Sequence, residues 1–171
     1  MEQIVASLPS YQQAPGRQVH LSMDHIDRYI DYAHTPNGLD VMLQYLHSIK
    51  GTGRLICLFG APGLRDRYKR PDMARVVEAL SDIMIITEDD SATENTWQII
   101  SDIVAGVQRK EGESLAIIPD RRLAIRYLCA IAQPGDVVLL AGKGHEKVLL
   151  TNAGKIPRSD ETVLKEERQK K

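Results

Sequence analysis

Short apolar runs alternate with amphipathic helical patterns along most of the chain, and this alternation limits its fold more than any other feature. Within 38–49, for example, Leu39, Met42, Leu43 and Leu46 recur at helical spacing. Because strands that alternate with helices pair in parallel, the pattern predicts an α/β fold, with a Rossmann-like, mostly parallel sheet flanked by helices. The expected strands are 26–30, 55–59, 82–87, 114–118 and 136–141, and the expected helices are 38–49, 71–80, 95–107 and 120–132.

The two ends of the chain differ from this repeat. Residues 1–25 contain proline, glycine and many glutamines with little periodicity, so we expect a linker or arm there. One α/β domain is expected over 26–171, since the whole chain has the length of a single domain. Near its end, a short strand at 147–150 is expected to pair antiparallel at the sheet edge, before a charged helix.

The composition of the chain limits the kinds of partner that it is expected to bind. The formal charge of -1, from 22 basic and 23 acidic residues, gives no general attraction to nucleic acid or to an anionic membrane. Cys57 and Cys129 lie in apolar patterns and look like buried hydrophobes, without disulfide or metal-ligand spacing. No signal peptide or membrane-spanning run is visible. We therefore expect a soluble, cytoplasmic, monomeric protein with no nucleic-acid or membrane partner, and we assign no metal-ligand residue in the chain.

Chemically active residue types gather where the expected strands end. The stretch 31–37 combines an acid, a tyrosine, a histidine and a threonine, and Pro36 keeps Thr35 out of the helical region. The loop 60–70 carries several cations that suit a carboxylate or phosphate, although a merely solvated basic loop explains it equally well. Ligands of α/β sheets bind at the carboxyl ends of strands, which is where these stretches fall.

Two further loops follow the third and fifth strands. Glu88, Asp89 and Asp90 form an acidic triplet that could receive an amine, but such triplets are more often solvated or cap a helix. The segment 142–146 places lysine, histidine and glutamate among two glycines that permit a tight backbone. The chain has no Walker loop, nucleophile elbow, HExxH or GxGxxG after the first strand, so the common enzyme classes find no support in local motifs.

Four ordered motifs, taken together, resemble the Mur ligases, most closely those of the MurE type. They are PGR at 15–17, DYAHTPN at 31–37, RDRxKRP at 65–71 and GKGHE at 142–146. The resemblance implies the C-terminal domain of an ATP-dependent ligase that adds a diamino acid to UDP-N-acetylmuramoyl-L-alanyl-D-glutamate in peptidoglycan synthesis. Residues 1–25 would then be the hinge and the end of the preceding domain.

The resemblance also implies ATP and Mg²⁺, both held mainly by a central domain with a P-loop that this chain lacks. The chain is therefore expected to be inactive alone, and no catalytic residue is assigned. The implied ATP-binding residues are Arg17, Asp31, His34 and Asn37. The implied amino-acid-binding residues are Arg65, Asp89, Asp90, Gly142 and Glu146, with Arg65 on a carboxylate and Glu146 on an ammonium.

Two departures from the family pattern bear on the substrate. The family's diaminopimelate enzymes carry a DNPR motif, whose counterpart at 89–92 ends in Ala92 instead of arginine. Burying the second carboxylate of diaminopimelate without a cation costs several kcal/mol, so L-lysine is favoured over meso-diaminopimelate. The loop 60–64, directly before Arg65, also departs from the family's GCGGD and reads GAPGL.

Two alternatives remain open on the sequence. One is another Mur-type ligase, such as MurF, a folylpolyglutamate synthetase or a MurE-like amidation enzyme. The other is a non-catalytic, stand-alone module that binds a nucleotide or an amino acid, which the missing P-loop would suit.

Overall fold

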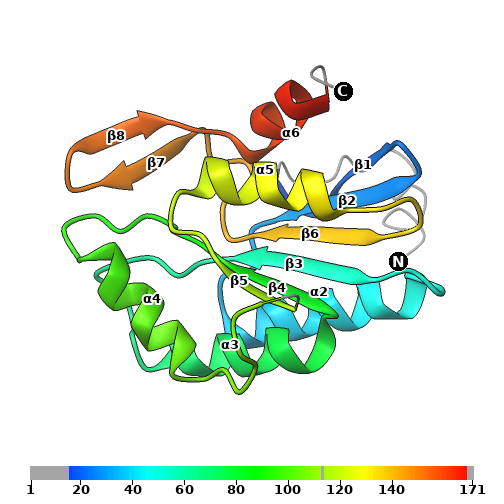
Figure 1. Cartoon of the computed structure of the whole chain (residues 1–171). Helices are drawn as coiled ribbons and strands as arrows, with labels where there is room; N and C mark the ends of the chain where they lie inside the picture. Colours follow the sequence, from blue (N-terminus) through cyan, green and yellow to red (C-terminus); the bar gives the residue numbers. More distant parts are fainter. Residues whose placement is uncertain (1–15, 113, 169–171) are drawn as a thin grey trace, which may run out of the picture.

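A six-stranded sheet in the order β1-β2-β6-β3-β4-β5 forms the centre of the computed structural model, which describes residues 16–112 and 114–168 (Figure 1). All neighbours pair in parallel except β1 and β2, which are antiparallel. The elements of the sheet are β1 (Val19–Met23), β2 (Ile26–Asp31), β3 (Leu55–Phe59), β4 (Ile83–Ile86), β5 (Leu115–Ile117) and β6 (Val137–Ala141). The predicted Rossmann-like α/β architecture is confirmed.

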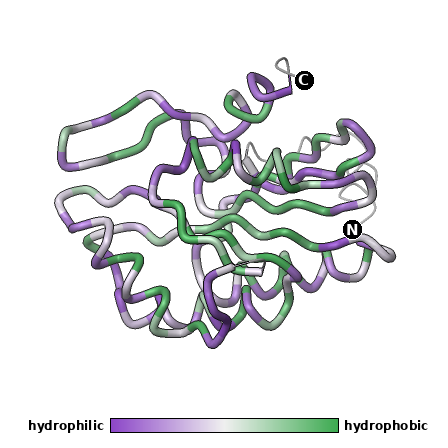
Figure 2. The backbone as a smooth tube through the Cα atoms, viewed as in Figure 1, coloured by the Kyte–Doolittle hydropathy of each residue, from purple (hydrophilic) through white to green (hydrophobic). Residues whose placement is uncertain are grey.

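Helices cover both faces of the sheet. One face packs against α2 (Pro36–Ile49), α3 (Lys69–Leu80) and α4 (Thr96–Val104), and the other against α5 (Arg121–Ile131) and α6 (Asp160–Arg168). Figure 2 shows apolar residues concentrated in the central strands between the two helical layers. Fully buried strands of this kind are typical of parallel sheets covered on both sides. No helix in the described ranges is long and apolar enough to cross a membrane.

Local signals explain where the helices begin. Thr35 has extended backbone (φ -132°, ψ 156°), and its hydroxyl accepts a hydrogen bond from Gly38 N at 3.1 Å, so α2 begins directly at Pro36. The predicted start at residue 38 was two residues late. Asp120 caps α5 through a bond from Leu123 N to its side chain at 2.9 Å. The turn after β2 is thereby rigid, which matters for the residues that it carries.

Two predictions at the ends of the domain were wrong. Val19–Met23, expected as part of an irregular arm, forms the edge strand β1, because its half-buried alternation is too short to stand out in the sequence. The strand predicted at 147–150 is β7 (Val148–Thr151), and it pairs with β8 (Gly154–Pro157) in a separate hairpin instead of joining the sheet (Figure 1). Residues 1–15 of the predicted arm lie outside the described residues.

A buried ion pair joins α6 to the sheet. Arg121 and Asp160 are both fully buried, and Arg121 donates to the two Asp160 oxygens at 2.9 and 2.7 Å. Arg121 also donates to the carbonyl of Ala141 at 2.9 Å, at the end of β6. Burial disfavours the charge on Arg121, but Asp160 outweighs it and holds the pKa of the guanidinium above its usual range. The pair therefore fixes α6 against the strand end that leads into the segment 142–146.

Replacing Asp160 by asparagine should destabilise the domain by about 3–5 kcal/mol, because it leaves the Arg121 charge buried without a counter-ion. Urea denaturation measures the change in unfolding free energy. Glu161→Gln, at the exposed neighbouring position, should change stability by less than about 0.5 kcal/mol. Equal effects of the two substitutions would contradict a dominant role for the buried pair.

Candidate functional site

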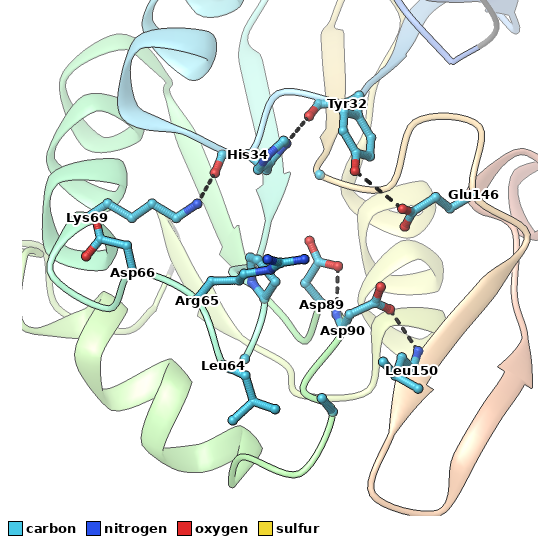
Figure 3. A pocket seen from close by; sticks show the side chains of 14 residues that line it. Tyr32, His34, Leu64, Arg65, Asp66, Lys69, Asp89, Asp90, Glu146 and Leu150 are labelled. Atoms are coloured by element: carbon cyan, nitrogen blue, oxygen red, sulfur yellow. Dashed lines mark hydrogen bonds between the residues drawn. The ribbon is translucent and has the colours of Figure 1, made fainter.

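A cavity of about 550 Å³ opens at the carboxyl ends of the parallel strands, where α/β folds bind ligands. Loops after β2, β3, β4 and β6 form its walls, and the β7–β8 hairpin adds Leu150 (Figure 3). The five residues predicted to bind the amino acid all line it: Arg65, Asp89, Asp90, Gly142 and Glu146. Segments far apart in the sequence thus bring both charge signs to one place.

Lys143 joins the acids of this cavity. Its side chain is only 1% exposed, and Nζ lies 2.5 Å from Glu146 Oε2 and 2.7 Å from Asp90 Oδ1. A third carboxylate oxygen, Oδ1 of Asp89, lies 3.7 Å from the same nitrogen. Burial disfavours the ammonium, but its bonds to Asp90 and Glu146 outweigh that effect and raise the pKa of Lys143. The acids are therefore partly neutralised from within the protein.

Asp89 is the most enclosed of the three acids. It is 5% exposed, and burial raises the pKa of its carboxyl above the usual range despite the nearby Arg121 and Lys143. Asp90 N donates to Asp89 Oδ1 at 2.7 Å. Gly142 passes close by with φ +106°, and a Cβ at that position would lie 2.6 Å from Asp89 Oδ2. Only glycine fits there, which explains the residue type at the start of this loop.

Cations line the opposite side of the cavity. Arg65 points from its loop into the space, and Lys69 donates to the carbonyl of His34 at 2.9 Å (Figure 3). Burial lowers the pKa of the Lys69 ammonium, with Asp66 and Asp89 acting against it. A ligand that carries both a carboxylate and an ammonium would meet complementary charges at the two sides.

The loop 60–70 is held in place by a buried arginine. Arg70 is fully buried and donates to Glu94 at 2.7 and 2.8 Å and to Asp102 at 2.8 Å. Glu94 in turn accepts a bond from Leu64 N at 2.9 Å, at the cavity rim. Arg67 also pairs with Asp102. Two of the loop cations that the sequence suggested for an anion therefore serve the protein itself, because acids of the next loop and helix reach them.

The residues predicted to bind ATP fall into two places. Arg17, Asp31 and Asn37 line a shallower cavity of about 380 Å³ beside the start of α2, whereas His34 lines the larger cavity. The Asp31 carboxylate accepts bonds from Gln18 N and Ala33 N, both at 2.8 Å. The structure thus brings three of the four together and places His34 on the other side of the same turn.

A comparison with known proteins shows to which family a chain with this site belongs. The family profile described as "Mur ligase, glutamate ligase domain" matches residues 16–144. The chain belongs to the Mur ligase family. The 2,6-diaminopimelate-adding UDP-N-acetylmuramoyl-L-alanyl-D-glutamate ligase of Gloeobacter violaceus is 42% identical over 168 residues, covering 97% of this chain and 34% of the relative. The similarly named ligase of Bacteroides thetaiotaomicron is 38% identical, covering 96% of this chain and 35% of that protein.

Solved structures agree with the sequence relatives. A ligase of the same name superposes with a TM-score of 0.85 at 34% identity, covering 98% of this chain and 34% of the other. A folylpolyglutamate synthase of Thermotoga maritima shares the fold at 14% identity, with a TM-score of 0.56 and coverage of 83% and 31%. The chain therefore spans about a third of the length of the relatives that it matches.

Three contributors to this Mur ligase site were not predicted. Lys143 lay within a quoted motif without a role, although a lysine between two glycines, at the same predicted sheet edge as the acids of 88–90, was a usable signal. Tyr32 was noted only as part of the turn 31–37, but its hydroxyl also donates to Glu146 Oε1 at 3.5 Å, and its ring contacts the rings of His34 and His145. Leu150 enters from the hairpin through bonds of its backbone to Asp90 and Ala92, which nothing local in the sequence indicates.

The metal-binding side chains of this Mur ligase domain can be examined for a place that would hold the implied Mg²⁺. In the described part of the chain, no three side chains of histidine, cysteine, aspartate or glutamate gather in a way that would hold a metal ion. The nearest acids, Asp89, Asp90 and Glu146, are engaged by the Lys143 ammonium instead. Nothing here is built as a magnesium site, so no chemical step is assigned to the ion in this domain.

Glu94→Gln should make the domain less stable at neutral pH, on the order of 2 kcal/mol, and flatten its acid unfolding. The Arg70 hydrogen bonds lower the pKa of Glu94 from 4.5 to about 2, so its contribution is complete above pH 4.5 and is lost as the pH falls toward 2. Thermal unfolding measured from pH 7 to pH 2 tests this. The exposed Glu111→Gln serves as control, and parallel pH profiles for wild type and Glu94→Gln would contradict the assignment.

Proposed function

We propose that this chain is the C-terminal domain of a MurE-type ligase, which uses ATP to join a diamino acid to UDP-N-acetylmuramoyl-L-alanyl-D-glutamate. The observation that carries the proposal is the cavity in which Arg65 and Lys69 face Asp89, Asp90 and Glu146. An α-amino acid with a basic side chain offers the matching carboxylate and ammonium groups. The names of relatives that are 38 to 42% identical support the same reaction.

In this reaction ATP phosphorylates the γ-carboxyl of the glutamate, and the amine of the incoming amino acid then displaces phosphate. The domain contributes by binding and orienting the amine and by closing the site against water, which would hydrolyse the acyl phosphate. We assign the amino-acid carboxylate to Arg65. Asp89, Asp90, Gly142 and Glu146 surround the side-chain ammonium at the far end of the cavity.

ATP would lie against the second cavity, beside the first turn of α2. Arg17, Asp31 and Asn37 line it, and His34 lines the other cavity from the same turn. The rigid Thr35 cap and the two bonds to Asp31 pre-form this turn, so little ordering is needed on binding. Mg²⁺ and the ATP phosphates would be held mainly by the part of the ligase that precedes this domain, for which the residues before β1 would form the hinge.

We propose L-lysine as the amino acid that is added, and two features of the cavity support this choice. Ala92 lines it where the family's diaminopimelate enzymes carry an arginine, so the distal carboxylate of diaminopimelate would lack that cation. Asp66, Asp89, Asp90 and Glu146 also outnumber Arg65 and Lys69, and with Lys143 the group keeps one formal negative charge. Lysine, with a net charge of +1, complements it better than neutral diaminopimelate. A monomeric, cytoplasmic enzyme is part of the same proposal.

The reaction and its specificity are tested in a chimera that carries this chain in place of the matching third of the Gloeobacter violaceus ligase. Phosphate release with ATP and the UDP-muramoyl dipeptide should depend on the diamino acid. We expect kcat/KM for L-lysine to exceed that for meso-diaminopimelate at least about tenfold, the effect of one poorly compensated charge. A chimera that unfolds cooperatively but releases no phosphate with either amino acid would overturn the proposed function, and a preference for diaminopimelate would overturn only the specificity.

Two substitutions in the chimera should distinguish the roles of the two cavities in binding the amino acid and ATP. Glu146→Gln should raise KM for the amino acid about tenfold or more, because it removes the acid that receives the ammonium, and should leave KM for ATP within about twofold. His34→Ala should act mainly on KM for ATP. Steady-state kinetics with each substrate varied in turn gives both constants, and equal small effects on both would refute the assignment of the cavities.

A further inference from the structure

Lys143 is the most constrained charged side chain in the cavity region. It is 1% exposed, and its ammonium lies within 2.5 to 3.7 Å of carboxylate oxygens of Glu146, Asp90 and Asp89. These acids come from two loops, after β6 and after β4, and the sheet places β3 between those strands. The lysine therefore ties together the two loops on either side of the strand that leads to Arg65.

We propose that Lys143 is a positioning residue for the incoming diamino acid, holding Glu146 and Asp90 at the separation and orientation that receive its side-chain ammonium. The proposal rests on the proposed function, since it names how the acids of that site are arranged. Lys143 binds Oε2 of Glu146, while Tyr32 binds Oε1 at 3.5 Å, so the carboxylate is oriented from two sides.

The bonding pattern of Asp90 supports this role. Within the described chain, both hydrogen bonds that its carboxylate accepts end on Oδ1, from Lys143 Nζ at 2.7 Å and from Leu150 N at 2.8 Å. That arrangement leaves Oδ2 for an outside donor, and Asp90 lines the cavity. Lys143 and the β7–β8 hairpin together fix which oxygen of Asp90 bonds within the protein and which oxygen is left for the ligand.

Charge gives a second reason for an internal cation here. Three carboxylates that share a site repel one another, which works against holding them close together. One buried ammonium offsets part of this repulsion and lets the three acids lie around a single cavity. Because the nitrogen touches all three acids, its removal would change both their charge and their positions.

A purely structural role would have different consequences. If Lys143 only stabilised the fold, its loss would reduce the amount of active enzyme, which lowers kcat while leaving KM for the amino acid unchanged. A positioning role instead changes KM for the diamino acid and its preferred length, with little effect on KM for ATP. The two roles are therefore separable by kinetics in folded variants.

The test uses the chimera described above, with the unsubstituted chimera measured first. Lys143→Met keeps the length of the side chain and removes its charge, and it should raise KM for the diamino acid at least about tenfold while KM for ATP stays within about twofold. Lys147→Met is the matched control, since Lys147 is exposed and lies four residues further along the same loop. It should leave both constants unchanged.

Lys143→Arg provides a second variant that keeps the charge. Its larger guanidinium should push the acids toward the cavity, so the ratio of kcat/KM for L-ornithine to that for L-lysine should rise at least about threefold, ornithine being one methylene shorter. If Lys143→Met does not unfold cooperatively and is therefore not folded, Lys143→Arg still tests the positioning role of Lys143.

The outcomes are distinct. An active chimera whose folded Lys143→Met variant keeps its amino-acid KM, or whose folded Lys143→Arg variant keeps its ornithine-to-lysine ratio, overturns this inference and leaves the proposed function intact. Failure of both variants to fold assigns Lys143 to stability alone and also overturns it. An inactive but folded parent chimera removes the basis of both proposals.

Discussion

The position of β6 between β2 and β3 is the constraint on which the site depends. The chain lays down β2, β3, β4 and β5 with α2, α3 and α4 on one face, and only then returns along α5 to insert β6. That return places the last loop, 142–146, beside the two polar turns that begin after β2 and β3. The buried pair of Arg121 and Asp160 fixes the arrangement, since Arg121 also binds the carbonyl that ends β6.

Sequence periodicity predicted the central sheet well, because each strand and helix there buries a continuous apolar surface. β3 was predicted to the residue at Leu55–Phe59, and the helix predicted at 120–132 is α5 at Arg121–Ile131. β1 and β8 escaped detection for a physical reason. Both are short and partly exposed, and they owe their structure to pairing with a neighbour more than to their own composition.

The sequence indicated where the candidate site lies, but it did not show which of its charged side chains contact one another. Strand-end position brings Arg65, Asp89 and Glu146 near one another, and their shared cavity follows from the parallel sheet. Which cation pairs with which acid depends on how far the side chains extend across the loops. The spacing of these residues along the sequence does not determine that. Arg70 illustrates this: it looks like its neighbours in the sequence, yet it is buried against Glu94 and Asp102.

The β7–β8 hairpin has a consequence beyond its place in the cavity wall. It stands outside the main sheet and meets the loop after β4 through the backbone of Leu150, which bonds to Asp90 and Ala92. Its strands contribute little to the buried core, so their side chains can change during evolution without disturbing the central strands. A wall built in this way can change the lining of this end of the cavity while the strand-end loops on its other sides keep their geometry.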